Sequence, residues 1–537
     1  MASMRMDLLQ FLKQAVHISH SRRLASWSPI FVLGNPSADL DSIISAILYS
    51  YFASYTSGGK TRQYYIPIVN LPDVHSGQEL RRLRPEFATA LRLATSTEST
   101  PHSWQRGHDH DQQVLENATL EEAILTIADL KERLLSKDAG GHSGEGQTSA
   151  AAETTLDVVL VDWNSLPLTS VGPNTSMFNA PTGVYEGLRL SILGCIDHHE
   201  DESFIPYMLH RSNPSTTTHW NEPRCIQTGV GSCTSLVVRE LRSRGIWGDD
   251  PRTPEFDPSG SSTLTTLHEA QAAKLALAAI LADTANMTAE SKVSDVDRAA
   301  VSFLEGKIRR AFVRHQRGTS SNNKDIAGIE DNGWNRQEFY EEIMHAKSNS
   351  VENLTMDEVL GRDYKEWTEV SQQSGDPVKI GICNVVRPIS WIVSKASQSP
   401  RMEGTKKAAR RYHALFEHLS SFSRARGLDI VVLMTAFNGP PPTHNFKREL
   451  LVWDLNDRYR TDLELFESIA RSELGIVPWR LDQTTTHGDD FPFTELRLDG
   501  TFGPNFVGIW SQRDVSKSRK QIAPLLRNVL SGKLSRF

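Results

Sequence analysis

Gly34-Asn35-Pro36-Ser37-Ala38-Asp39-Leu40-Asp41-Ser42 joins two apolar runs near the start of the chain. The run before it, 30–33, predicts a buried strand, and the run after it, 43–49, predicts a helix. Asp39 and Asp41 are therefore expected in a turn past the carboxyl end of a strand, where open α/β sheets bind ligands. The two carboxylates can converge on divalent cations, or Asp41 can simply cap the helix that follows.

Length and charge limit the possible classes of protein. A chain of 537 residues predicts two or three domains with ample core. The net charge of −7 gives no general attraction to nucleic acid or to an anionic membrane, and no apolar run is long enough to span a bilayer. We expect a cytoplasmic monomer with neither of these partners, whose first 19 residues form a helix of the fold instead of a targeting peptide.

The cysteines lack the spacing of metal ligands, so we expect small buried hydrophobic residues in a reducing compartment. They are Cys195, Cys225, Cys233 and Cys383.

The first half of the chain alternates predicted strands with predicted helices, which indicates a parallel sheet. Its further strands are expected at 64–69, 156–161 and 190–196, and a helix at 78–93. The second half predicts a separate α+β domain, with strands at 378–385, 428–434 and 449–453 and helices at 405–426 and 461–474. Capping boxes are expected to open helices at Thr119, Thr266 and Ser518.

Four acidic clusters in the first half fall at or just past the ends of predicted core elements. One such cluster alone is ordinary turn chemistry, and a lone histidine is usually a hydrogen-bonded structural residue. Together, carboxylates and imidazoles this dense would repel one another unless cations compensated them. Two neighbouring divalent ions need about this many ligands. The clusters are Asp39 with Asp41, Asp162, Asp197-His198-His199, and Asp283.

These clusters, in this order and spacing, resemble the DHH phosphoesterase superfamily, which is named after a motif that Asp197-His198-His199 matches. The second half is similar to the DHHA2 domain, whose basic motifs match Asp363-Tyr364-Lys365 and Ser518-Arg519-Lys520. The most similar branch is the eukaryotic cytosolic exopolyphosphatases, which include the prune-like proteins. The resemblance implies an α/β fold with a mostly parallel-sheet DHH domain at 1–290, a helical connector and polar insertion at 291–335, and a smaller α+β DHHA2 domain at 336–537. It also places the active site in the cleft between the two domains.

The resemblance implies a metal-binding role for each matching residue. Asp39 would bind one ion and Asp41 the other, and Asp162 would bridge both. His198 and Asp283 would complete the ligands of the second ion.

The resemblance also implies the substrate contacts. His199 would face the substrate phosphate and act with Asp162 in catalysis. Lys365, Arg519 and Lys520 would bind phosphate oxygens, which neutralises charge during in-line attack by water. Basic residues at the start of a helix oppose its dipole, and an incoming phosphate would remove that conflict.

Two positions depart from parts of the family. Asn35 stands where the pyrophosphatase branch has histidine and resembles the exopolyphosphatase branch, so dedicated pyrophosphatase activity is not expected. As a ligand, its hard amide oxygen favours Mg²⁺ over softer ions, with Mn²⁺ as the second candidate. Trp163 replaces a histidine often found after the bridging aspartate.

The sequence thus predicts an exopolyphosphatase that hydrolyses the terminal phosphoanhydride bonds of inorganic polyphosphate with two metal ions and releases orthophosphate. One alternative is a prune-like nucleotide phosphodiesterase or an enzyme acting on tri- and tetraphosphate. Another is a regulatory binding protein that keeps the site but has weak or no catalysis.

Four further segments have two interpretations each. His108-Asp109-His110-Asp111 is a metal cluster or a solvated loop, and Gly229-Val230-Gly231-Ser232 is a phosphate-binding turn or a plain cap. The basic set Lys406, Lys407, Arg410 and Arg411 is a solvated helix face or a track for a long anion. His487-Gly488-Asp489-Asp490 is a loop of the active-site cleft or a surface turn.

Overall fold

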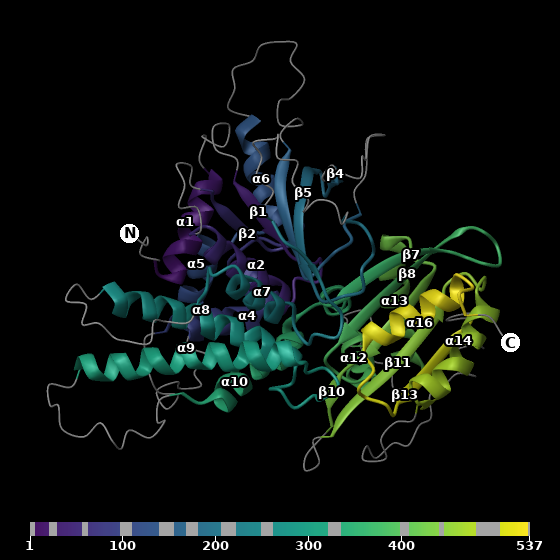
Figure 1. The fold of residues 1–537 in the computed structure, drawn as a ribbon. Helices are drawn as coiled ribbons and strands as arrows, with labels where there is room; N and C mark the ends of the chain where they lie inside the picture. The colour runs from purple at the N-terminus through teal and green to yellow at the C-terminus, as the bar shows by residue number, and fades with distance from the viewer. Residues whose placement is uncertain are drawn as a thin grey trace, which may run out of the picture. The chain divides into compact units, whose positions relative to one another are not determined.

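The computed structural model separates into two compact units, Met1–Asn349 and Ser350–Phe537, each described by itself below (Figure 1). The narrower domain limits expected from the sequence, with a connector at 291–335, remain a prediction. The residues that the structure describes are 6–20, 29–55, 63–96, 110–138, 155–167, 181–205, 222–248, 261–319, 334–397, 408–439, 445–479 and 505–534.

The first unit contains a six-stranded sheet in the order β2-β1-β3-β5-β4, with β6 beside β5. The pairs of β1 with β2, β1 with β3, β3 with β5, and β5 with β6 are parallel, and only the β4–β5 pair is antiparallel. The expected mostly parallel α/β sheet is confirmed. The strands are β1 (Ile30–Leu33), β2 (Tyr65–Ile68), β3 (Leu156–Val161), β4 (Thr182–Tyr185), β5 (Leu188–Asp197) and β6 (Arg224–Ile226).

Helices cover both faces of this sheet, as parallel strands that are apolar on both sides require. Buried side chains of α1 (Leu8–His20) and α6 (Ile127–Asp138) pack with those of the sheet in one apolar core. On the other side, α2 (Leu40–Ala53) and α7 (Cys233–Ser243) contact the strands, and α8 (Ser261–Asp283) packs against both helices. This layer also contains α9 (Asp295–Thr319) and α10 (Arg336–Asn349), which pack on α8.

The helix expected over 78–93 is two helices, α3 (Gln78–Leu83) and α4 (Pro85–Thr95), separated by Arg84. A proline disfavours the helical conformation of the residue before it, so α3 ends there. Pro85 itself fits the first position of α4, where its missing N–H costs nothing. The predicted single helix is therefore wrong in its continuity.

Two of the three expected capping boxes are wrong. Thr119 lies inside α5 (His110–Ala123), and its hydroxyl donates to the carbonyl of Leu115 at 2.8 Å. Thr266 likewise lies inside α8. The same residue spacing occurs within helices, where a threonine hydroxyl bonds the preceding turn. At Ser518 the prediction is confirmed, because a reciprocal Ser518–Gln521 box opens α16 (Arg519–Leu530).

The second unit contains a seven-stranded sheet in the order β12-β13-β11-β9-β8-β7, with β10 beside β11. Only the β8–β9 pair is parallel, so this is the expected α+β domain. The sequence did not indicate β7, at one edge of this sheet, or β13. The strands are β7 (Tyr364–Val370), β8 (Pro377–Val385), β9 (Ile430–Thr435), β10 (Phe437–Asn438), β11 (Phe446–Asp454), β12 (Ile476–Pro478) and β13 (Val507–Gln512).

Helices α14 (Arg460–Glu473), α16 and α13 (Ala408–Arg426) cover the second sheet. Buried residues of α14 and α16 share one core with alternate residues of β8, β9 and β11. From α13, Phe416 packs edge-on against Trp453 of β11 and Phe422 against Tyr364 of β7. The smaller helices are α11 (Met356–Gly361), α12 (Ile389–Ser397) and a 3-10 turn, η5 (Ser350–Asn353).

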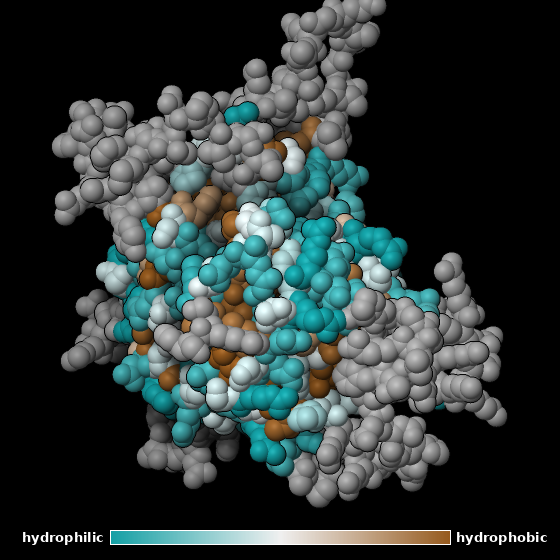
Figure 2. Space-filling view, turned by 90° about the vertical axis from the view of Figure 1, so that its right-hand side faces the viewer, coloured by the Kyte–Doolittle hydropathy of each residue, from teal (hydrophilic) through white to brown (hydrophobic). Residues whose placement is uncertain are grey.

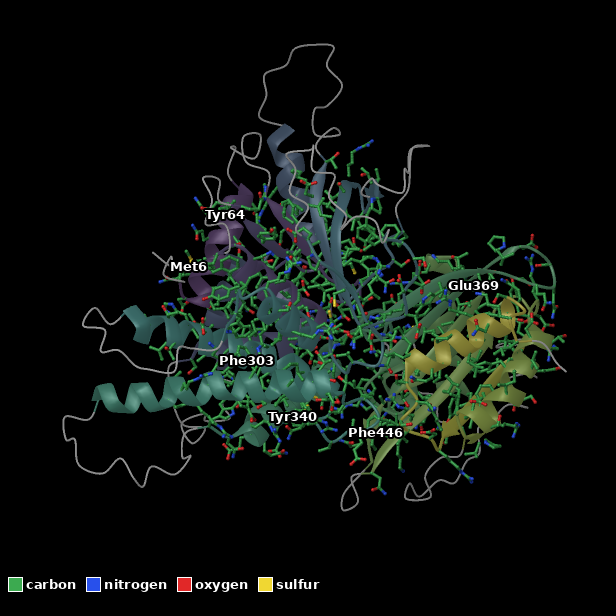
Figure 3. All side chains as sticks on the ribbon, in the orientation of Figure 1. Met6, Tyr64, Phe303, Tyr340, Glu369 and Phe446 are labelled. Carbon is green, nitrogen blue, oxygen red and sulfur yellow. The ribbon has the colours of Figure 1, made fainter. Side chains whose placement is uncertain are left out.

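The surface shows no simple division by polarity in the view of Figure 2, where hydrophilic and hydrophobic residues are interspersed among those drawn in colour. Glu369, labelled in Figure 3, lies on β7 and pairs with Arg527 of α16 at 2.5 Å. Within the described residues, no helix combines the length and apolar character needed to cross a membrane.

Candidate metal centre

The loop between β1 and α2 is held in one shape by its own polar groups. Asp39, not Asp41, is the N-cap of α2, and its carboxylate accepts from the Ser42 N–H at 3.0 Å. The backbone N–H of Asn35 donates to Ser42 Oγ at 2.7 Å. The interpretation of Asp41 as a plain cap is therefore wrong.

Asp41 points instead at the N-terminus of α7 and is only 2% exposed. Its carboxylate accepts from Cys233 N at 2.6 Å, Thr234 N at 2.9 Å, and the hydroxyls of Ser232 and Thr234, both at 2.7 Å. Burial raises the pKa of Asp41, but His198 and these donors outweigh it, so the pKa lies below its usual value. The positive end of the helix thus helps to keep this carboxylate charged.

The turn at Gly229–Ser232 offers no cradle for a phosphate in this structure. The N–H groups of Gly231 and Ser232 donate to the buried carboxylate of Asp297, at 2.9 and 3.3 Å. The next two N–H groups, those of Cys233 and Thr234, donate to the carboxylate of Asp41. Ser232 is the N-cap of α7 but makes no capping hydrogen bond with its side chain, and carboxylates from α2 and α9 take that place.

Asp162 follows β3 and occupies the left-handed region, with φ of +57°. Its Oδ2 accepts from the Asn35 amide at 2.7 Å, and its Oδ1 lies 3.2 Å from His198 Nε2 and 3.6 Å from His199 Nδ1. One potential ligand atom from each of Asp162, His198 and His199 lies within 4.8 Å of the others. Ends of β1, β3 and β5 thus converge, as the sequence predicted.

The Asp197-His198-His199 motif is internally ordered by its first residue. Asp197 is fully buried and accepts from the His198 N–H and from His199 Nδ1, both at 2.7 Å. His198 Nδ1 lies 3.0 Å from the carbonyl of Val230, which can only accept, so Nδ1 carries the proton. His198 Nε2 then lies between Asp162 and Asp41, the latter at 4.0 Å, where the lone pair of the neutral imidazole can bind a metal. This is how proteins orient a histidine toward a metal.

Asp283 ends α8 within electrostatic range of the same carboxylates. Burial raises its pKa well above the usual value, and the negative charges of Asp41, Asp39 and Asp162 raise it further, while Lys347 opposes them. Ionised carboxylates packed this closely require positive charge among them.

The donors present fit divalent cations. The Asn35 side chain is fully buried, and its Oδ1 accepts no hydrogen bond from the part of the chain that the structure describes. Carboxylate and amide oxygens together with an imidazole nitrogen are ligands for Mg²⁺ and Mn²⁺. Asp39 lies on the same segment as Asn35 and Asp41, and the charges of Asp41, Asp39 and Asp162 act on Asp283.

In the second unit two of the expected phosphate-binding residues, Lys365 and Arg519, act on Asp363. Arg519 forms an ion pair with the Asp363 carboxylate at 2.8 Å and donates to the Asp363 carbonyl at 3.0 Å, and Asn384 donates to the carboxylate at 2.7 Å. Burial raises the pKa of Asp363, but Arg519, Asn384 and Lys365 lower it well below its usual range. Lys520 is exposed beside Arg519.

Sequence reasoning missed several residues that hold the site. Asn164 donates to Asp197 at 2.5 Å and accepts from the Glu202 N–H at 2.9 Å. Asn70, past β2, donates to the carbonyl of Gly34 at 2.8 Å and accepts from the Tyr185 hydroxyl. Both follow predicted strands, which was the available signal. The ring of Trp163 packs edge-on against that of Tyr185, 5.7 Å between centroids.

Other candidates play no part in the site among the described residues. The cysteines carry raised pKa values from burial, and all four are free thiols. Arg411 is exposed. The side chains of 108–111, Lys406, Lys407, Arg410 and 487–490 lie outside the described residues.

Comparison with known proteins relates this chain to a domain family and to a described protein. Residues 341–529 match the DHHA2 domain family. A protein of Schizosaccharomyces pombe (strain 972) described as a “Putative exopolyphosphatase” is 24% identical over 498 residues, which cover 92% of this chain and 89% of that protein.

A crystal structure of CDC45 from Entamoeba histolytica aligns over 97% of this chain and 99% of its own, at 8% identity. Its TM-score of 0.18 is too low to support a structural argument. The DHHA2 match and the relationship over most of the chain, together with the converging acidic and histidine clusters, support membership of the DHH phosphoesterase superfamily.

Proposed function

We propose that this protein is a metal-dependent exopolyphosphatase, which hydrolyses the terminal phosphoanhydride bond of inorganic polyphosphate and releases orthophosphate. The observation that carries the proposal is the convergence of Asn35, Asp41, Asp162 and His198 from three separate segments. The DHHA2 match and the relationship to the Schizosaccharomyces pombe protein described as a “Putative exopolyphosphatase” support the same activity.

Six residues would hold two divalent ions, Mg²⁺ or Mn²⁺: Asn35, Asp39, Asp41, Asp162, His198 and Asp283. Bound there, such ions supply Lewis-acid activation of the attacking water and neutralise charge on the phosphoryl oxygens. The protein's contribution is to fix the ligands, and α7 does so for Asp41 through four hydrogen bonds.

His199 is the group best placed to meet the phosphate beside the metal ligands. Its Nδ1 hydrogen bond to Asp197 fixes the ring and directs Nε2 to the opposite side. The side chain is 28% exposed, whereas that of His198 is only 5% exposed. A histidine held in this way can donate a hydrogen bond to a phosphate oxygen and a proton to the leaving group.

Lys365, Arg519 and Lys520 supply the positive charge that a polyphosphate chain requires. Arg519 offers a planar fork of donors that binds two phosphate oxygens at once, and Asp363 holds that fork in place. We propose that these residues bind the phosphates next to the scissile bond.

A panel of substrates tests the activity directly. With Mg²⁺ present, we expect the pure protein to release orthophosphate from long-chain polyphosphate faster than from triphosphate, tetraphosphate, pyrophosphate or cyclic AMP. Preference for the short polyphosphates, or cleavage of the cyclic nucleotide alone, would contradict the proposal and favour the prune-like alternative. Failure on every substrate would favour a binding protein.

Replacing Arg519 by alanine tests the proposed binding of substrate phosphates by the second unit. Loss of a charge-assisted contact predicts a KM for polyphosphate about 10- to 100-fold higher, with Mn²⁺ binding unchanged. Arg471→Ala is the control, because Arg471 pairs with Glu467 on the exposed side of α14. Loss of Mn²⁺ binding in Arg519→Ala, or a KM like that of the control, would contradict the assignment.

A further inference from the structure

Arg84 is a buried cation that touches the loop carrying the metal ligands. It stands between α3 and α4 and is 2% exposed. Pro85 keeps its backbone out of the helical region, with φ of −129° and ψ of 57°, which breaks the chain direction at this residue. The break explains why a charged residue in a helical sequence turns inward.

The guanidinium of Arg84 binds two successive carbonyl groups of the loop. Its Nε donates to the carbonyl of Ala38 at 2.7 Å, and a terminal nitrogen donates to the carbonyl of Ser37. The other terminal nitrogen donates to the carbonyl of Leu83 at 3.2 Å. Only a planar fork of donors can satisfy several fixed acceptors in this way, and an ammonium group cannot.

The two carbonyl groups lie where the loop backbone is strained. Ala38 has φ of +44°, a left-handed conformation that a residue with a side chain adopts only when its surroundings impose it. This conformation turns the chain so that Asp39 caps α2 and Asp41 enters the first helical turn. The contacts of Arg84 therefore act at the bend that sets the directions of both carboxylates.

The charge of Arg84 matters as well as its shape. A guanidinium stays protonated at all physiological pH values, and the Ala38 carbonyl that it binds belongs to the residue before Asp39. A fixed positive charge under the loop offsets part of the repulsion among carboxylates that must lie close together.

We propose that Arg84 is a positioning residue of the metal centre, which holds the 37–38 backbone so that Asp39 and Asp41 keep the geometry needed by two divalent ions. The proposal rests on the proposed metal-dependent function. It assigns no contact with substrate to Arg84.

The test compares Mn²⁺ binding by the full-length wild type, Arg84→Met and Arg84→Lys, using titration calorimetry and the electron paramagnetic resonance spectrum of bound Mn²⁺. Methionine keeps much of the apolar stem, and lysine keeps the charge without the fork. We expect the Kd for Mn²⁺ to rise about 10- to 100-fold in Arg84→Met, with only partial recovery in Arg84→Lys. Arg133→Met is the control, because Arg133 donates to Ser19 of α1 instead of the loop.

Near-ultraviolet circular dichroism at 25 °C confirms that each variant is folded. An Mn²⁺ affinity in folded Arg84→Met within twofold of the wild type would overturn the proposal. Wild-type Mn²⁺ affinity in Arg84→Lys would overturn the role of the guanidinium fork. If Arg84→Met does not fold, the comparison of Arg84→Lys with the wild type remains the test. A wild type that binds Mn²⁺ but releases no phosphate refutes the proposed activity while leaving the effect of Arg84 on binding measurable.

Discussion

Asp162 combines a strained backbone with a buried carboxylate, and both features serve the same site. A left-handed aspartate is uncommon outside turns, and here it places Oδ1 within 3.2 Å of His198 Nε2. Asparagine adopts this backbone as easily as aspartate and has nearly the same shape. The charge at this position can therefore be removed without changing the fold.

We predict that Asp162→Asn lowers kcat for orthophosphate release by more than about 100-fold, because a ligand matters more than the outer partners whose loss costs 10- to 100-fold. Circular dichroism and the thermal transition should stay close to those of the wild type. The control is Asp157→Asn, at the opposite end of the same strand. Turnover in Asp162→Asn within a few-fold of the control would rule out a bridging role.

In the second unit, Asp363 is a carboxylate whose charge positions a proposed phosphate-binding residue, Arg519, through an ion pair. Its folded-state pKa is depressed, so the ionised carboxylate stabilises the fold above the ordinary value of about 3.9, and this stabilisation is lost as the pH falls below it. The pair is partly exposed, with side-chain exposures of 17% and 27%, which reduces its strength.

We predict that Asp363→Asn lowers the free energy of unfolding by about 1–2 kcal/mol at pH 7. The difference from the wild type should shrink when the same urea titration is repeated at pH 2.5. A difference that stays constant or grows in acid would show that the carboxylate charge is not the cause.

At the scale of elements, the N-terminus of α7 organises the candidate metal centre. The N–H groups at the start of α7 donate to two carboxylates, Asp41 from α2 and Asp297 from α9. Three helices therefore meet at one point. Gly231 makes this possible, because a Cβ there would lie 2.8 Å from the carbonyl of Lys292 and from Thr284 Cγ2.

We predict that Gly231→Ala destabilises the protein by about 1–3 kcal/mol, since the crowded atoms must move apart. It should also weaken Mn²⁺ binding, because Asp41 shares the displaced turn. Gly248→Ala is the matched control, as a Cβ there meets no atom within 4 Å among the described residues. Equal thermal transitions for the two variants, measured by scanning calorimetry, would contradict this account.

At the scale of the whole molecule, the two units have separate cores. The core of the second unit is built from its own sheet with α14 and α16, and the six proposed metal ligands all belong to the first unit. Metal binding and the second unit's folding should therefore be separable.

We predict that residues 350–537 alone unfold in one cooperative thermal transition and bind no Mn²⁺. Phe466→Ala in this fragment should cost about 3–5 kcal/mol, because that side chain is fully buried in the core. A fragment without near-ultraviolet circular dichroism, or one insensitive to Phe466→Ala, would show that the unit does not fold independently.

Local patterns predicted the strands that precede Asp41, Asp162 and His198, because a buried parallel strand is apolar along its whole length. The same approach failed at Thr119 and Thr266, where a capping pattern lies inside a helix. It also joined α3 and α4 across Pro85, and so missed the inward turn of Arg84.

The sequence by itself determined the sheet-forming segments, the two classes of domain and the residue types that gather at strand ends, since these depend on periodicity and on motifs local in the chain. Only the tertiary structure decided that Asp41 binds α7 and that Arg84 supports the loop before α2. These contacts join residues 46 to 193 positions apart, and no local pattern encodes which distant donor meets a given acceptor.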